Sequence, residues 1–137
     1  MSQENVESIR RGFDVFNRVG ASGDLTALVQ LQREFFDPAI EYTPLVEGIR
    51  ICGYEDLLDY WQRWFEPWSE IRWDIEEVID AGEQVLAVFT IVARGKGSGM
   101  EITQRTFTVF DVRDGKAARV REYLMRDEAL EAVGLRK

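Results

Sequence analysis

The second half of the chain restricts the fold most, because its strand-like segments follow one another with only short turns between them. Apolar and charged residues alternate at 71–75, the period of a β-strand, and strands are then expected at 84–94, 101–112 and 117–124. Turns are expected at 80–83, 95–99 and 113–116, where glycine and aspartate gather. Because parallel neighbours need a crossover of about a dozen residues or more, these segments predict an antiparallel meander.

The first half of the chain is predicted to be helical. Apolar residues recur every three or four positions, as on one face of a helix. The expected helices and the short strand between them are placed as follows: a first helix over 6–16, a second from Asp24 to Asp37-Pro38, a strand over 39–43, a third helix over 54–65 and a short C-terminal helix between Asp127 and Gly134. Helices followed by strands form an α+β arrangement, which we expect to be a single domain over 1–137.

The residue types present exclude several kinds of chemistry. The 137 residues include no histidine, which removes Ser-His-Asp and Cys-His nucleophile systems and histidine-ligated metals. The one cysteine, Cys52, allows no intrachain disulfide and no cysteine cage for zinc. We therefore expect neither a metal nor a cofactor.

The net charge bears on partners and location. Seventeen basic and 25 acidic residues give a charge of −8, which disfavours nucleic acid and anionic membranes as partners. No apolar run approaches the ~20 residues that span a bilayer, and residues 1–11 carry no apolar stretch typical of a signal peptide. We expect a cytoplasmic protein that contacts neither nucleic acid nor a membrane.

Side-chain alternation identifies the inward face of the last two strands. Val120 and Leu124 place Glu122 on the inward face of 117–124, because alternate residues of a strand share a face. The uncharged face of 101–112 is also predicted to point inward, and it carries Ile102, Gln104, Thr106, Thr108, Phe110 and Val112. Polar groups on a concave inner face indicate a pocket. Two alternatives stay open: the threonines are ordinary strand residues with locally bonded hydroxyls, or a twist brings Glu122 to the surface as a salt-bridge partner.

Three stretches of the sequence carry a family resemblance: 35–42 (FFDPAIEY), 111–116 (DVRDGK) and 121–130 (REYLMRDEAL). Together with the order of elements, they resemble the SnoaL-like (polyketide cyclase-like) branch of the nuclear transport factor 2-like superfamily. The resemblance implies a cone-shaped α+β barrel with three N-terminal helices packed in a highly curved antiparallel sheet, and a deep internal pocket. It also implies a homodimer.

The catalytic residues known in this superfamily transfer only in part. Thr43 and Thr108 stand where the resemblance places the ketosteroid isomerase carboxylates, so that mechanism is excluded. Glu122 stands where limonene epoxide hydrolase has its water-activating acid and Tyr42 where it has a tyrosine. The partner Arg-x-Asp pair of that enzyme falls near Val88 and Thr90, so half of its apparatus is missing.

These observations define a candidate site. Glu122 is the candidate general base, since a carboxylate among apolar neighbours has a raised pKa. The candidate ligand-binding residues are Tyr42, Trp61, Trp64, Trp73, Gln104, Thr106 and Thr108. Tyr60, beside Trp61, is expected to face outward. We expect a small apolar, oxygenated ligand, with acid–base chemistry of the isomerase, cyclase, dehydratase or hydrolase type. The alternative is a non-catalytic ligand-binding or dimeric interaction module, and the sequence leaves open whether the protein is an enzyme.

The outward face of the sheet provides a separate argument for a dimer. Phe107 and Val109 alternate outward from 101–112 and are too apolar for water. We expect a second copy to cover them. The charges expected to pair across the interface are those of Arg105, Asp111, Arg119 and Arg121.

Overall fold

The structure is a computed structural model that describes residues 2–45 and 49–135. Within these residues the chain forms four helices and six strands. They are α1 (Ser2–Ser22), α2 (Ala27–Phe35), β1 (Phe36–Thr43), β2 (Ile51–Cys52), α3 (Gly53–Phe65), β3 (Trp68–Ala81), β4 (Gln84–Gly95), β5 (Glu101–Arg113), β6 (Lys116–Tyr123) and α4 (Arg126–Ala132). The predicted helices and strands are all present, and β2 lies in a segment expected to be a loop, of which 46–48 fall outside the described residues.

The six strands form one sheet in the order β2-β1-β6-β5-β4-β3. The meander from β3 to β6 is antiparallel, as predicted. β1 and β6, however, run parallel, so the sheet is mixed and the expectation of a wholly antiparallel sheet is wrong at this pair. The long connection over 44–115, which includes α3 and four strands, provides the crossover that a parallel pair needs.

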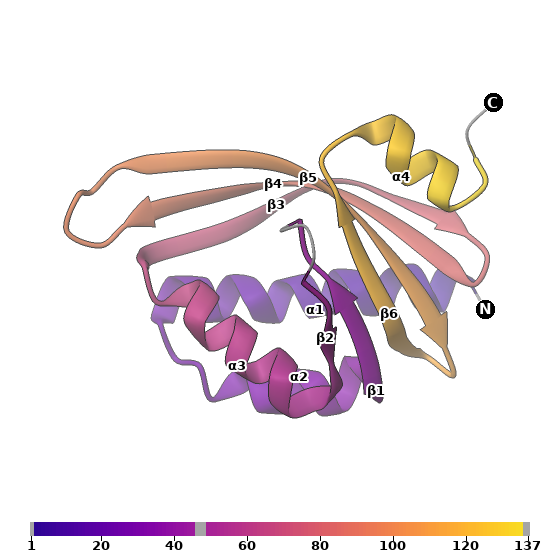
Figure 1. Cartoon of the computed structure of the whole chain (residues 1–137), viewed down its shortest axis with the longest axis horizontal. Coiled ribbons are helices and arrows are strands. Elements are labelled where there is room, and N and C mark those ends of the chain that lie inside the picture. The colour runs from indigo at the N-terminus through magenta and orange to yellow at the C-terminus, as the bar shows by residue number, and fades with distance from the viewer. Residues whose placement is uncertain (1, 46–48, 136–137) are drawn as a thin grey trace.

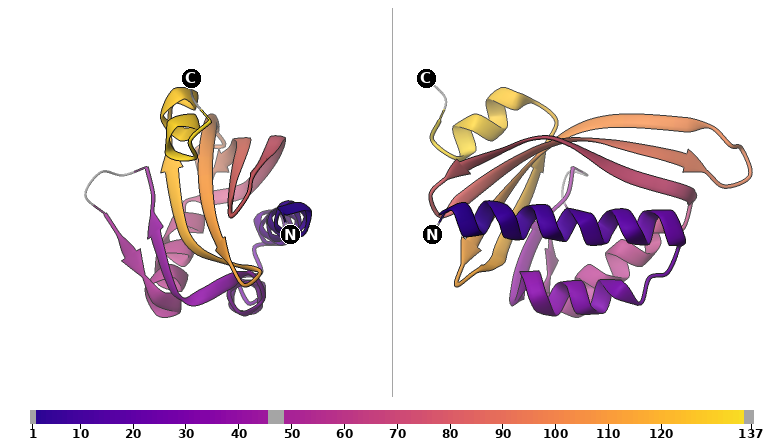
Figure 2. Two further views of the ribbon diagram at one scale, coloured as in Figure 1. Left: turned by 90° about the vertical axis from the view of Figure 1, so that its right-hand side faces the viewer. Right: turned by 180° about the vertical axis from the view of Figure 1, so that it is seen from behind.

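The sheet bends around the first three helices. Figures 1 and 2 show α1, α2 and α3 on one side of the sheet and α4 on the other. The strand register shifts between Ile75 and Glu77 in β3 and between Asp111 and Val112 in β5. Such irregularities bend a strand and increase its twist, which is consistent with the curvature seen here.

The edge strand β3 is held directly by α1. Trp73 N–H donates to Oδ1 of Asn17 at 2.6 Å, and Nδ2 of Asn17 donates to the Trp73 carbonyl at 3.1 Å. Helix and strand meet so closely at Gly20 that a Cβ there would lie 1.9 Å from the Ile71 carbonyl oxygen. The asparagine and the glycine therefore fix the distance between helix and strand on this side of the barrel.

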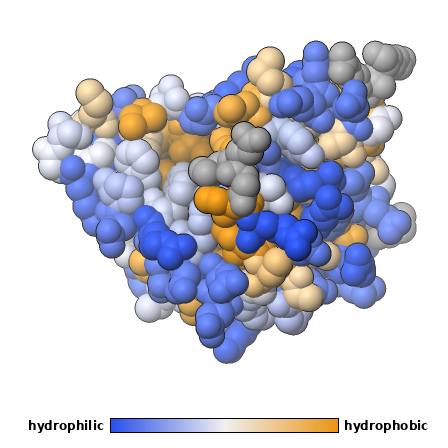
Figure 3. Space-filling view, viewed as in Figure 1, coloured by the Kyte–Doolittle hydropathy of each residue, from blue (hydrophilic) through white to orange (hydrophobic). Residues whose placement is uncertain are grey.

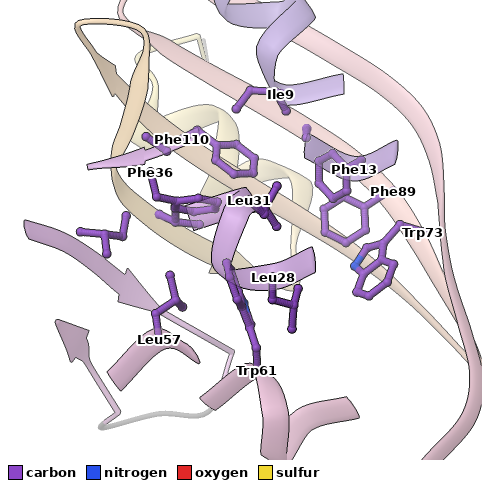
Figure 4. Packing of buried hydrophobic residues seen from close by; sticks show 14 of the residues in the cluster. Ile9, Phe13, Leu28, Leu31, Phe36, Leu57, Trp61, Trp73, Phe89 and Phe110 are labelled. Carbon is purple, nitrogen blue, oxygen red and sulfur yellow. The ribbon is translucent and has the colours of Figure 1, made fainter. Parts of the chain in front are cut away.

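The main core lies between these helices and the concave face of the sheet. Leu28, Leu31 and Leu57 from α2 and α3 are fully or almost fully buried, and Figure 4 shows them with aromatic rings from α1 and the sheet. Asp24 does not cap α2 as expected. It accepts hydrogen bonds from the N–H and hydroxyl of Thr26, and the helix begins only at Ala27.

The outward face of the sheet is covered by α4 of the same chain. A second cluster joins α4 to the strands: Leu86, Val88, Phe107, Val109 and Ala129 are buried together. The charges expected to pair across a dimer pair within the chain instead: Arg121 and Arg119 approach Asp111 at 3.3 and 4.0 Å, and Arg105 approaches Glu76 at 2.9 Å. The argument that a second copy must cover this face is therefore wrong, because α4 already covers it.

Strand alternation predicts burial only where helices lie beneath the strand. Thr106, Thr108, Phe110 and Val120 are buried as expected. Leu124 is 53% exposed and Ile102 is 47% exposed, and Gln104 is exposed as well. Figure 1 shows the reason for β5: the β4–β5 hairpin extends beyond the helices. Leu124 follows the last residue of β6, where the chain turns towards α4.

Candidate functional site

A cavity of about 290 Å³ lies between α3, β1 and the concave face of β3–β6. In the space-filling view of Figure 3, the surface is hollowed between the β4–β5 hairpin and the chain near β1, and apolar atoms show in its depth. All eight residues singled out from the sequence line this cavity: Tyr42, Trp61, Trp64, Trp73, Gln104, Thr106, Thr108 and Glu122. The fold therefore brings them together, and the roles assigned to them stay predictions.

Glu122 is held by two donors from β1 and the chain that follows it. The hydroxyl of Tyr42 donates a hydrogen bond to Oε2 of Glu122, and the backbone N–H of Leu45 donates to Oε1 at 3.1 Å. The parallel β1–β6 pair makes this possible, since Tyr42 lies opposite Val120 in that pair. Glu122 is half-buried and lies at the cavity wall, so the alternative of a plain surface salt-bridge partner is wrong.

Burial is the largest influence on the pKa values of Glu122 and Tyr42. It raises the pKa of the Glu122 carboxyl group above its usual range, and the hydrogen bonds from Tyr42 and Leu45 offset part of that rise. Burial, and then the Glu122 carboxylate, raise the pKa of the Tyr42 phenol well above its ordinary value. The phenol is therefore the proton donor of the pair, and Glu122 is the group able to accept a proton from a ligand.

Two threonines stand beside this carboxylate. Thr108 lies opposite Glu122 in the β5–β6 pair, and Thr106 precedes Thr108 by two positions in β5, on the same face. Among the described residues, neither hydroxyl oxygen has a hydrogen-bond partner, although both are buried. The alternative interpretation, in which these hydroxyls are bonded locally, is therefore wrong. Burying a hydroxyl without a partner costs free energy. Gln104, nearer the hairpin, is exposed and donates from Nε2 to the carbonyl of Arg105.

The facing wall of the cavity is aromatic. Trp64 packs against Trp73 with ring centroids 5.7 Å apart and against Trp68 at 6.4 Å. Trp61 and Trp73 are 6% and 8% exposed, so they belong to the core as well as to the wall. Trp64 and Trp68 are only half-buried. These two rings are therefore the ones most open to a ligand.

Sequence reasoning missed two members of the site. Tyr60, expected to face outward, lines the cavity with its ring centroid 5.5 Å from that of Tyr42. Burial, and then the Glu122 carboxylate, raise its pKa to about 12. The sequence spacing could have indicated this position, because Tyr60 precedes Trp64 by one helical turn and so shares its face of the helix. The Leu45 backbone contact had no signal in the residue types, because a backbone donor is independent of its side chain.

Within the described ranges, no group of three His, Cys, Asp or Glu side chains is placed to hold a metal ion. The part of the chain that the structure describes also contains no helix long and apolar enough to cross a membrane. Among the described residues, the cavity lining offers the Glu122 carboxylate, the phenols of Tyr42 and Tyr60, the Gln104 amide, the hydroxyls of Thr106 and Thr108, and an aromatic wall.

Comparison with known proteins places this geometry in a family. The model of the SnoaL-like domain family matches residues 9–120. Among curated proteins, none matches the sequence significantly.

Solved structures resemble the whole fold at low sequence identity. One is a SnoaL-like protein from Jannaschia sp. CCS1 assigned as a polyketide cyclase, with a TM-score of 0.75 at 20% identity, covering 88% of this chain and 85% of that one. TerC, co-crystallised with polyporic acid, has a TM-score of 0.71 at 18% identity, covering 95% of this chain and 98% of its own. A Catenulispora acidiphila DSM 44928 protein with a ketosteroid isomerase-like fold, in complex with trimethylamine, has a TM-score of 0.67 at 16% identity, covering 89% and 91%. These likenesses concern the fold, whereas the family match covers most of the sequence. The chain belongs to the SnoaL-like domain family.

Proposed function

We propose that this protein binds a small, largely apolar molecule carrying oxygen in its cavity and transfers a proton on it through Glu122. The observation that carries the proposal is a carboxylate at the wall of an aromatic cavity, bonded to the Tyr42 phenol. Beside it are two hydroxyls that have no hydrogen-bond partner among the described residues. The family includes proteins assigned as polyketide cyclases, and TerC was crystallised with a small organic molecule, which is consistent with a small-molecule role.

The proposed reaction is the removal of a proton next to a carbonyl group. Burial raises the pKa of Glu122, which brings its basicity closer to that needed at neutral pH. A rotation about the Cα–Cβ bond of Thr106 or Thr108 exchanges hydroxyl and methyl, and so presents a donor to the oxygen where charge develops. Isomerisation and cyclisation both begin with such a step.

A non-catalytic binding module is the second candidate, and one observation favours it. Both oxygens of Glu122 already accept a hydrogen bond, from Tyr42 and from Leu45. This arrangement links β1 to β6 and serves the fold even without any reaction. A binding module would use the same cavity and aromatic wall, but Glu122 would only orient the ligand.

Proton exchange separates the two candidates. The probe is 2-tetralone, a bicyclic ketone whose acidic protons are followed by NMR as they exchange with deuterated water. We expect the protein to accelerate the exchange and Glu122→Gln to abolish the acceleration while binding of the ketone is retained. Exchange that is equally fast with the protein and with Glu122→Gln would assign Glu122 to binding alone.

A homodimer and a cytoplasmic location are carried forward as proposals. Because α4 covers the outward face, the dimer rests on the family resemblance rather than on exposed apolar residues. Sedimentation equilibrium at micromolar concentration tests it, and fractionation of the native cells tests the location.

A further inference from the structure

The charge of the cavity lining bears on the kind of ligand that the cavity can bind. Within the described residues, Glu122 is its one charged lining group, and the other lining residues are aromatic, aliphatic or neutral and polar. Both hydrogen bonds to Glu122 come from neutral donors, the Tyr42 phenol and the Leu45 backbone N–H. The negative charge is therefore solvated by dipoles and has no ion-pair partner in the described part of the chain.

The neighbouring cation does not compensate for this charge. Arg121 precedes Glu122 in β6, so its side chain points to the opposite face of the sheet. There its guanidinium lies 3.3 Å from Oδ1 of Asp111 and donates to the hydroxyl of Tyr123. A half-buried carboxylate without a cation is costly, and a positively charged ligand would remove that cost.

An aromatic strip runs from the residues beside the carboxylate to Trp68 and Trp73 in β3. Tyr42, which bonds Glu122, packs on Tyr60, and Trp64 lies one turn of α3 beyond Tyr60. Trp64 in turn packs on Trp68 and Trp73. Aromatic faces attract organic cations, more strongly where water is excluded.

Taken together, these features point to a ligand class. We infer that the ligand carries an organic cation, an alkylated ammonium group, which lies against the aromatic strip and pairs with Glu122. This inference rests on the proposed function and narrows its ligand. A cation beside Glu122 also favours the ionised carboxylate, which is the form that accepts a proton. A hard metal ion does not fit, because it needs several oxygen ligands and the cavity offers a single carboxylate.

Two probes of the same shape test the charge alone. The cation is (4-hydroxyphenyl)trimethylammonium, and its neutral counterpart is 4-tert-butylphenol, in which carbon replaces the charged nitrogen. Both are measured by isothermal titration calorimetry against the whole protein. We expect the cation to bind at least about tenfold more tightly than the neutral probe.

Two variants make the result specific to Glu122. Glu122→Gln keeps the shape and removes the charge, and we expect it to bring the two probes to similar affinity. Glu76→Gln makes the same change at a carboxylate that pairs with Arg105 on the outer surface, and the preference should persist.

The other outcomes of the titrations would contradict the cationic ligand, its pairing with Glu122, or both proposals. Equal or tighter binding of the neutral probe would overturn the cationic ligand and leave the proposed function standing. A cation preference that survives Glu122→Gln would overturn the pairing. Binding of neither probe would contradict both proposals.

Discussion

Removing the Tyr42 hydroxyl tests how the carboxylate is held. Tyr42→Phe keeps the ring and its packing on Tyr60 but leaves Oε2 of Glu122 without its donor. A hydrogen bond to an ionised group contributes about 1.5–3 kcal/mol, so we expect the free energy of unfolding to fall by about that much at neutral pH. At acidic pH Glu122 is protonated, the bond is a neutral one, and the expected loss shrinks to about 0.5–1.5 kcal/mol.

The direction of the pH dependence follows from the pKa of Glu122. Because burial raises this pKa in the folded state, the folded protein binds more protons than the unfolded one between the ordinary pKa and the raised pKa. The contribution of Glu122 to stability is therefore greatest below the ordinary glutamate pKa and is lost as the pH rises through the raised one. Tyr42→Phe removes a bond that lowers the pKa, so it moves this fall to higher pH.

Tyr54→Phe is the matched control. The hydroxyl of Tyr54 donates to the Phe36 carbonyl at 2.6 Å, so the same change removes a bond to a neutral acceptor. Urea unfolding followed by far-ultraviolet circular dichroism, at several pH values, measures both variants. A loss for Tyr42→Phe equal to that of Tyr54→Phe, and independent of pH, would refute the view that Tyr42 bonds a carboxylate.

Three further changes test the packing. Phe107→Ala should lower the free energy of unfolding by about 3–5 kcal/mol in chemical denaturation. The loss should be the same at any protein concentration, because α4 of the same chain covers Phe107. A loss that varies with concentration would indicate that a second copy covers it. In α1, Gly12→Ala should stabilise by about 0.5–1 kcal/mol, since its nearest atom is a Leu31 methyl carbon at 4.0 Å. Gly20→Ala should instead destabilise by more than about 1 kcal/mol, because its Cβ would meet the Ile71 carbonyl. Thermal melts in which Gly20→Ala is as stable as the unchanged protein, or more stable, would contradict the close approach of α1 to β3.

Strand alternation predicts a large part of the site from the sequence. It identifies Thr106, Thr108 and Glu122 as neighbours on an inner face, because backbone pleating alone decides which residues share a face. It fails for Leu124. It places Gln104 correctly on the cavity side but does not predict that this side chain is exposed, because burial depends on what covers a strand and not only on its pleat.

The contacts that local patterns miss are those made across the fold. The cover of Phe107 by α4 depends on where the chain turns after β6. The Tyr42–Glu122 bond depends on a parallel pairing between strands almost 80 residues apart, which no short pattern specifies. The family resemblance implied a pocket, but the donors that hold its carboxylate come from the structure.

Native mass spectrometry of the protein isolated from its own cells tests the central claim most directly. We predict a small-molecule adduct on the folded chain that is lost on unfolding, reduced in Glu122→Gln and retained in Glu76→Gln. The bare mass of the chain in every sample, or an adduct equally abundant in both variants, would contradict a ligand held in the cavity at Glu122.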